Sequence, residues 1–203
     1  DDESPEDEPA SDARVIFIID KSGSMKGPRL AMAKLALIKT LRQMGQIGES
    51  DEIGKFYIYF FNHKSDAMPA SAMLEATPAN IQRMSEWLNS QEARSFKGTD
   101  PSDSIKSAFT HDPSELFLLT DGDFRTKRNE TSVRDLLTGL NPDKSVKINT
   151  FGVGEALRGE GETTLMLIAK ENGGVYTFID SNLNSPPAVI SLDDVTLGAG
   201  PEK

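Results

Sequence analysis

The sequence has no cysteine, only two histidines, and no hydrophobic run close to the length of a membrane span. The absence of cysteine excludes disulfides, thiol catalysis and cysteine-ligated metal sites. A transmembrane helix needs about 20 consecutive apolar residues, so we expect a soluble globular domain without direct membrane insertion. The histidines, His63 and His111, stand alone in the sequence. We therefore expect both at loop or surface positions rather than as ligands.

Charge is distributed unevenly along the chain. Residues 1–13 hold seven acidic side chains and no basic one, so the net charge of −10 leaves only −3 for residues 14–203. A mildly acidic body lacks the basic face that nucleic-acid binding requires, and we expect no nucleic-acid partner. We interpret residues 1–13 as a disordered acidic linker. Such a linker suits a domain tethered outside a membrane and equally suits a cytosolic multidomain chain. Because the chain begins with Asp1 rather than Met, we interpret it as a fragment or a processed form.

The longest purely apolar stretch near the start, residues 15–19, predicts a strand buried on both faces. It stops at Asp20, and Ser22, Gly23 and Ser24 follow on a tight loop. In open α/β sheets, ligands bind at the carboxyl edge of the strands. Carboxylate and hydroxyl oxygens are hard donors that suit Mg²⁺ and argue against zinc or copper.

Strand and helix patterns alternate over the rest of the chain. A second apolar strand, residues 116–119, is followed by Asp121 and Asp123. Further strands are predicted at 55–61, 146–153 and 175–179, with a short edge strand around 67–68. Helices are predicted at 28–44, after Thr77-Pro78, after Asp100-Pro101, at 132–140 and at 162–171. This alternation predicts one doubly wound α/β domain, residues 14–180, with a mostly parallel sheet and helices on both faces. Residues 181–203 form a tail that packs on this domain or leads elsewhere.

Three short motifs occur in order at plausible spacing: Asp20-x-Ser22-x-Ser24, Thr99 in FKGTD, and Asp121 in LLTDGD. Together they resemble the von Willebrand factor type A family, whose fold is shared with integrin inserted domains. INTFGVG at 148–154 and LMLIAKENGGVY at 165–176 resemble the same family. The resemblance covers residues 14–179 and implies the Rossmann-like fold of that family.

The resemblance also implies a metal-ion-dependent adhesion site (MIDAS). In this family Ser22 and Ser24 would bind the ion directly, and Thr99 would bind it directly or through water. Asp20 and Asp121 would act through bridging waters. The expected cation is Mg²⁺ or Mn²⁺, with Ca²⁺ as an alternative. The function of the domain would be to capture a Glu or Asp side chain of a partner protein through this cation, without catalysis.

This ligand set has a physical rationale of its own. Mg²⁺ requires six oxygens in octahedral array and retains water readily. Two neutral hydroxyls leave the ion electrophilic, so it binds an anionic ligand from a partner. The same neutrality predicts weak binding of the cation alone.

Other functions for the same residues stay open. The loop at 20–24 is also consistent with simple helix capping, with Ser22 or Ser24 accepting helix N–H groups. Asp121 and Asp123 are spaced as in Mg²⁺-dependent phosphatases of the haloacid dehalogenase type, although Phe124-Arg125 does not fit that motif. A third hypothesis is a structural domain whose site binds no metal.

The charged neighbours of the motifs also have expected roles. Asp100 is expected to cap the following helix, and Asp123 to be a solvated turn residue. Lys21 is expected to point to solvent beside the site, where it could contact a partner's acid. A small basic cluster after the Asp121 loop is either plain surface or a feature that steers an acidic ligand: Arg125, Lys127 and Arg128.

Overall fold

The computed structural model describes residues 13–45, 53–94, 98–124, 132–155, 159–182 and 188–189. Within them, the chain forms an eight-stranded sheet in the order β3-β2-β1-β5-β6-β7-β8, with β4 also paired to β2. The strands are β1 Arg14–Asp20, β2 Lys55–Phe61, β3 Ser65–Ala67, β4 Leu74–Glu75, β5 Glu115–Thr120, β6 Lys147–Gly154, β7 Tyr176–Asp180 and β8 Ala188–Val189. The pairs that join β2, β1, β5, β6 and β7 are parallel, whereas β3, β4 and β8 pair antiparallel.

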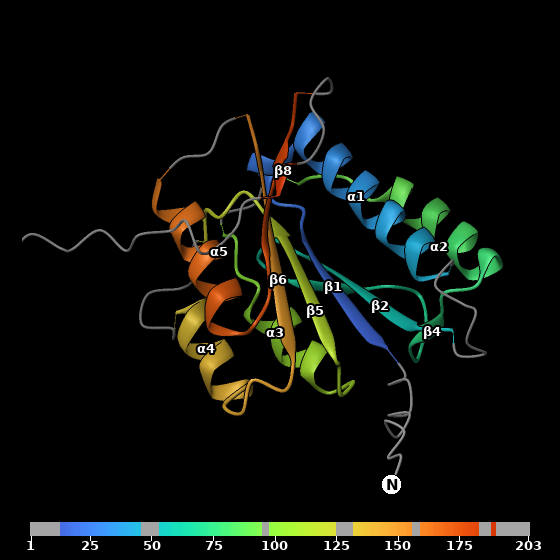
Figure 1. Cartoon of the computed structure of the whole chain (residues 1–203). Helices are drawn as coiled ribbons and strands as arrows, with labels where there is room; N and C mark the ends of the chain where they lie inside the picture. The colour runs from blue at the N-terminus through green and yellow to red at the C-terminus, as the bar shows by residue number, and fades with distance from the viewer. Residues whose placement is uncertain are drawn as a thin grey trace, which may run out of the picture.

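Helices cover both faces of this sheet. They are α1 Pro28–Met44, α2 Pro78–Ser90, α3 Ser102–Phe109, α4 Val133–Leu140 and α5 Gly159–Glu171, and a short 3-10 helix, η1, spans Gly23–Met25. Figure 1 shows α1 and α2 side by side on one face, with α3, α4 and α5 on the other. The predicted doubly wound α/β fold is thereby confirmed. No described helix combines the length and hydrophobicity that crossing a bilayer requires.

The local sequence explains why these helices begin and end where they do. Pro28 opens α1, where its missing N–H costs nothing, and Gly45 follows its last residue. Thr77 caps α2 by accepting a 3.3 Å hydrogen bond from the N–H of Asn80. One stripe of α1 is buried at three- and four-residue spacing, as expected for an amphipathic helix: Leu30, Ala33, Leu37 and Leu41.

The core lies around β1 and β2, whose residues are buried almost from end to end. Each fully buried large apolar side chain contributes about 1.5–3 kcal/mol, so these central strands are held firmly. Their parallel register aligns Asp20 with Phe61, and Ile19 with Leu119 of β5. The carboxyl ends of β1, β2 and β5 therefore lie side by side at one edge, and the loops that follow them meet there.

Several predicted boundaries differ from the structure. The short edge strand spans Ser65–Ala67, and the pattern missed β4. Helix α5 begins at Gly159, earlier than predicted, because acidic residues in its first turn favour the positive helix terminus despite the glycines. β8 pairs with β7, with Val189 opposite Thr177. The predicted acidic linker, residues 1–13, lies outside the described residues except for Ala13. The division into linker, domain and tail stays a prediction.

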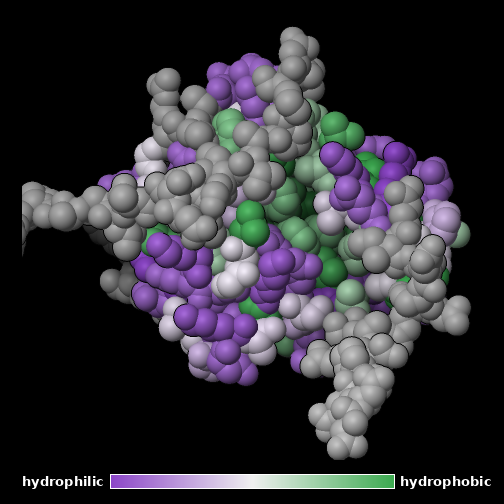
Figure 2. Space-filling model, in the orientation of Figure 1, coloured by the Kyte–Doolittle hydropathy of each residue, from purple (hydrophilic) through white to green (hydrophobic). Residues whose placement is uncertain are grey.

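The surface of the described part is mainly hydrophilic over the helices. In the orientation of Figure 1, the space-filling view in Figure 2 shows purple side chains there and a greener area over the strands between α5 and α1. Two aromatic side chains of the sheet, Phe117 and Phe151, are only half-buried and lie 5.8 Å apart between ring centroids.

Candidate metal centre

Backbone hydrogen bonds join the predicted site segments at the carboxyl edge of the sheet. The N–H of Lys21, just after β1, donates to the carbonyl of Phe61 at the end of β2 (2.8 Å). The N–H of Asp100 donates to the carbonyl of Asn62, just after β2 (2.7 Å). Thr99 is buried in this second segment. The structure therefore brings the Thr99 segment to the same edge as the loop after β1.

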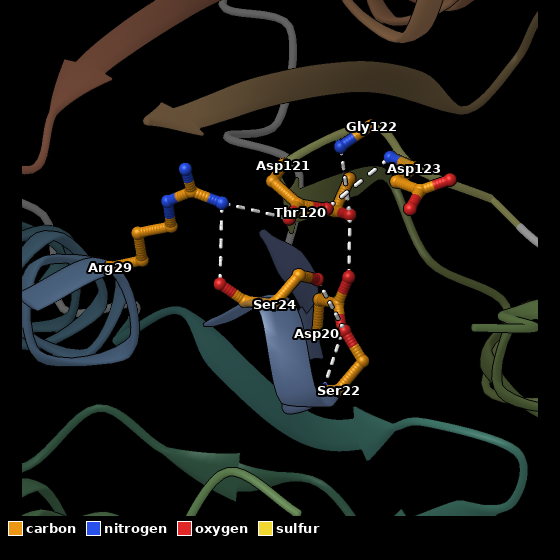
Figure 3. Close-up of polar contacts among 8 residues, drawn as sticks. All are labelled: Asp20, Ser22, Ser24, Arg29, Thr120, Asp121, Gly122 and Asp123. Atoms are coloured by element: carbon orange, nitrogen blue, oxygen red, sulfur yellow. Dashed lines mark hydrogen bonds and ion pairs between the residues drawn. The ribbon is translucent and has the colours of Figure 1, made fainter. Parts of the chain in front are cut away.

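Asp20 is the fully buried carboxylate of the site, with 0% exposure. One oxygen, Oδ1, accepts the N–H of Ser22 at 2.7 Å, and Oδ2 accepts the hydroxyl of Thr120 at 2.7 Å (Figure 3). Burial raises the pKa of Asp20 to about 6, although these hydrogen bonds act in the opposite direction. The charge of Asp121 adds to the rise. The negative charge on Asp20 is thus only partly compensated, and a nearby cation would favour it.

The two serine hydroxyls point toward each other. Ser22 Oγ and Ser24 Oγ lie 3.0 Å apart, with Ser22 buried and Ser24 exposed (Figure 3). Ser22 precedes η1 without a side-chain capping bond, and Gly27, not a serine, precedes α1. The helix-capping interpretation of this loop is therefore wrong. Two neutral oxygens are instead gathered at one point beside a buried carboxylate.

Asp121 follows β5 and is joined to the first loop by an arginine. Its Oδ2 accepts a 3.2 Å hydrogen bond from Arg29 Nη1, and Oδ1 accepts the N–H of Asp123 at 3.3 Å. Arg29 Nη1 also donates to the carbonyl of Ser24 at 3.2 Å (Figure 3). This guanidinium consequently ties the loop after β1 to the loop after β5.

The loop after β5 also rests directly on α5. Gly122 has a φ of +80°, and a Cβ built there would lie 2.8 Å from backbone atoms of Gly161 in the first turn of α5. The two backbones approach so closely that neither position accommodates a side chain without a shift. The position of Asp121 therefore depends on the packing of α5.

A cleft of about 610 Å³ opens beside the candidate site, and we call it the edge cleft. Ser24, Arg29 and Asp121 line it on the site side, and α5 contributes Glu162 and Leu165. The hydroxyl of Tyr176, in the same lining, donates to Glu162 Oε1 at 2.9 Å. Side chains that could contact a partner therefore extend from the candidate site along the lining of the edge cleft.

Thr120 and Arg29 were not identified by the sequence reasoning. Thr120 ends β5 beside the end of β1, a neighbourhood that follows from the register Ile19–Leu119 and that no sequence motif indicates. Arg29 places a positive charge in the first turn of α1, where cations are unfavourable. That unusual position is a signal the sequence already contained.

The expectation for Lys21 is wrong. Its side chain is buried rather than solvated, and Nζ forms an ion pair with Asp66 of β3 at 2.7 Å. The same Nζ donates to the side-chain oxygen of Gln91 at 3.1 Å and lies 5.5 Å from the centre of the Phe60 ring. Lys21 therefore links β1 to neighbouring segments instead of facing a partner.

The other charged neighbours and the histidines can now be placed. Asp100 accepts the N–H of Ser102 at the start of α3 (3.0 Å), as expected for a cap, and Asp123 is exposed in its turn. His63 is exposed in a loop, and His111 lies in the turn after α3. The basic cluster lies outside the described residues: Arg125, Lys127 and Arg128.

Within the described part of the chain, no group of three or more His, Cys, Asp and Glu side chains could hold a metal ion. An ion at this edge would therefore need hydroxyl oxygens as well as Asp20 and Asp121. The donors gathered here are all oxygens, and such a set fits a hard divalent cation such as Mg²⁺ or Mn²⁺.

Comparisons with known proteins agree with this fold. The family model for the von Willebrand factor type A domain matches residues 13–178. A von Willebrand factor A domain-containing protein of Dictyostelium discoideum is 30% identical over 187 residues, which covers 87% of this chain and 20% of the relative. The inter-alpha-trypsin inhibitor heavy chain H3 of Mus musculus is 26% identical over 201 residues, covering 89% of this chain and 21% of the relative. The chain thus spans about a fifth of the length of these relatives.

Solved structures show the same fold. A von Willebrand factor type A structure from Catenulispora acidiphila aligns with a TM-score of 0.64 at 22% identity, covering 83% of this chain and 39% of that one. The proximal thread matrix protein 1 of the mussel byssus, with a zinc-occupied MIDAS motif, aligns with a TM-score of 0.61 at 15% identity, covering 83% and 43%. Since the family model matches most of the chain, this protein belongs to the von Willebrand factor type A family.

Proposed function

We propose that this domain binds another protein through a divalent cation, Mg²⁺ or Mn²⁺, with Ca²⁺ as an alternative. The observation that carries the proposal is the meeting of the buried Asp20 carboxylate with the hydroxyls of Ser22 and Ser24 at one edge. A buried charge needs compensation, and the serine oxygens beside it are not used for helix capping. A cation at this edge accounts for both features.

The residues expected to hold the ion have different roles. Ser22 and Ser24 would bind it directly through their hydroxyls, and Thr99 directly or through water. Asp20 and Asp121 would orient bound waters. Because the direct protein ligands are neutral, the bound ion keeps its attraction for an anion, and the carboxylate of a partner's Glu or Asp supplies one.

Two further observations support a cation at this place. The donors at the edge are oxygens only, which favours hard divalent ions. The zinc-occupied MIDAS motif of proximal thread matrix protein 1, which has the same fold, supports a divalent cation at this place but does not favour Mg²⁺ or Mn²⁺ over zinc. Membership of the von Willebrand factor type A family favours a binding domain over an enzyme, and a phosphatase that uses Asp121 and Asp123 is the alternative.

The first test measures the cation itself. We expect isothermal titration and thermal unfolding to show weak binding of Mg²⁺ and Mn²⁺ to the wild-type domain. Ser22→Ala and Ser24→Ala should lose this binding while keeping the circular dichroism spectrum of the wild type. Ser90→Ala, an exposed serine at the end of α2, is the matched control and should bind normally.

The second test measures capture of a partner. Proteins retained by the immobilised domain with Mg²⁺ should be released by EDTA and should not be retained by Ser22→Ala or Thr99→Ala. If millimolar metal produces neither heat nor a thermal shift, the structural hypothesis replaces this one. Mg²⁺-dependent turnover of an aryl phosphate that Asp121→Asn abolishes would instead establish the enzyme.

A further inference from the structure

Arg29 is the cation that the structure already holds at the candidate site. Its Nη1 contacts Asp121 Oδ2 and the carbonyl of Ser24, each at 3.2 Å. The side chain of Asp121 is 9% exposed and that of Arg29 is 33% exposed, so the pair is partly shielded from water. One guanidinium nitrogen thus serves both the loop after β1 and the loop after β5.

The position of Arg29 in its helix is electrostatically unfavourable. It is the second residue of α1, and the first turn of this helix has no acidic residue. The amino end of a helix carries a partial positive charge that favours anions and opposes cations. The stability of α1 therefore does not explain why an arginine stands at position 29, whereas the contact between Arg29 and Asp121 does.

We propose that Arg29 competes with the divalent cation for this site and so sets its affinity. The inference rests on the proposed function, because it concerns the same cation. A guanidinium keeps its proton at every physiological pH, so its positive charge is permanent. A divalent ion held by the same two loops is repelled by that charge and shares Asp121 with it.

The competition makes cation binding depend on the partner. A partner's carboxylate at the ion brings a negative charge that offsets the repulsion between the ion and Arg29. Arg29 also lines the edge cleft, from which a guanidinium can donate further hydrogen bonds to an approaching carboxylate. By linkage, a ligand that raises the affinity for the cation is itself bound more tightly when the cation is present.

The test compares Mn²⁺ and Mg²⁺ affinities by isothermal titration at 0.15 M salt. Arg29→Gln and Arg29→Met remove the charge and should bind the ions about 10-fold more tightly than the wild type. Arg29→Lys keeps the positive charge, so its affinity should lie closer to that of the wild type than to that of the two neutral variants.

Arg42→Gln is the matched control, since it removes the same charge from the last turn of α1. At 1.5 Å of rise per residue it lies about 20 Å away along the helix axis. That distance is well beyond the Debye length of about 8 Å at this salt concentration. The cation affinity of Arg42→Gln should therefore equal that of the wild type.

Thermal unfolding separates competition from a merely structural role. With EDTA, Arg29→Gln should melt at or below the wild-type temperature, because Asp121 loses its ion pair. With saturating Mn²⁺, its upward shift should exceed that of the wild type. If the wild type binds cations and both neutral variants bind equally or more weakly, the inference is overturned and the proposed function stands. If neither the wild type nor the variants bind, the proposed function itself fails.

Discussion

The hydroxyl of Thr120 donates a 2.7 Å hydrogen bond to the carboxylate of Asp20, across 100 residues of sequence. The same hydroxyl oxygen accepts the N–H of Gly122 at 3.1 Å. A hydroxyl has one proton to donate, and the backbone N–H occupies an acceptor position, so the proton is directed to Asp20. The last residue of β5 thereby orients the last residue of β1.

Thr120→Val should therefore destabilise the domain and weaken cation binding. The substitution keeps the shape of the side chain but leaves Oδ2 of the buried Asp20 without its partner. A hydrogen bond to a charged group contributes about 1.5–3 kcal/mol, and urea unfolding at pH 7.5 should show a loss of this size. Thr120→Ser keeps the hydroxyl and should lose about 1 kcal/mol, for one buried methyl group. Equal stability of the valine variant and the wild type would contradict this role.

Lys21→Ala should lower the free energy of unfolding by about 2–3 kcal/mol. The buried aliphatic stem and the ion pair with Asp66 are both lost. Lys26→Ala makes the same change at an exposed position of the same loop and should stay within about 0.5 kcal/mol of the wild type. Chemical unfolding measures the loss in free energy of unfolding of each variant. Similar losses for both would contradict the stabilising, buried position of Lys21.

Gly122→Ala should reduce both stability and cation affinity. Its φ of +80° disfavours alanine, and the new Cβ would press on the backbone of Gly161. We expect a loss of about 2–3 kcal/mol, with a displaced Asp121 loop and weaker binding in titration. Gly139→Ala, at an exposed helical position with open space, should instead gain roughly 0.5–1 kcal/mol. A gain at both positions would argue against the tight contact with α5.

His111 should make the domain less stable in mild acid. Its ring stacks on Tyr57 and bonds the hydroxyl of Tyr59, and Arg14 donates to its carbonyl. Burial, helped by the charge of Arg14, lowers the pKa of His111 below its ordinary value of 6.5. The unfolded chain therefore takes up the proton first. The contribution of neutral His111 is complete above pH 6.5 and is lost as the pH falls toward its folded pKa.

The measurement is the difference in urea unfolding between the wild type and His111→Phe from pH 7.5 to pH 5. The phenylalanine keeps the ring stacking but cannot titrate, so its stability should fall less over this interval. Parallel curves for the wild type and His111→Phe would exclude the predicted dependence.

Much of the fold was predictable from local patterns. The apolar run before Asp20 identified the central strand, and the Thr77-Pro78 pair identified the start of α2. Such signals act between neighbours in sequence, so they can be read without knowing the fold. Strand β4 was missed because its two residues are too few to show a periodicity.

The candidate site was predictable only in part. The motifs placed Asp20, the two serines and Asp121 at loops, and the structure brings those loops to one edge. The roles of Lys21 and Arg29 did not follow from the motifs. Lys21 is neutralised by Asp66 from β3, and Arg29 by Asp121 from the loop after β5. These partners become neighbours only when the sheet has formed.

The sequence by itself determined the order of the longer strands and helices and the oxygen-bearing residues at the strand ends, because hydrophobic periodicity and turn chemistry are local. Only the tertiary structure decided which side chains pair with one another: Thr120 with Asp20 by a hydrogen bond, and Arg29 with Asp121 and Lys21 with Asp66 by ion pairs. The physical reason is that hydrogen bonds and ion pairs depend on distances of a few ångströms. Strand register and loop packing set those distances between residues that are far apart in the chain.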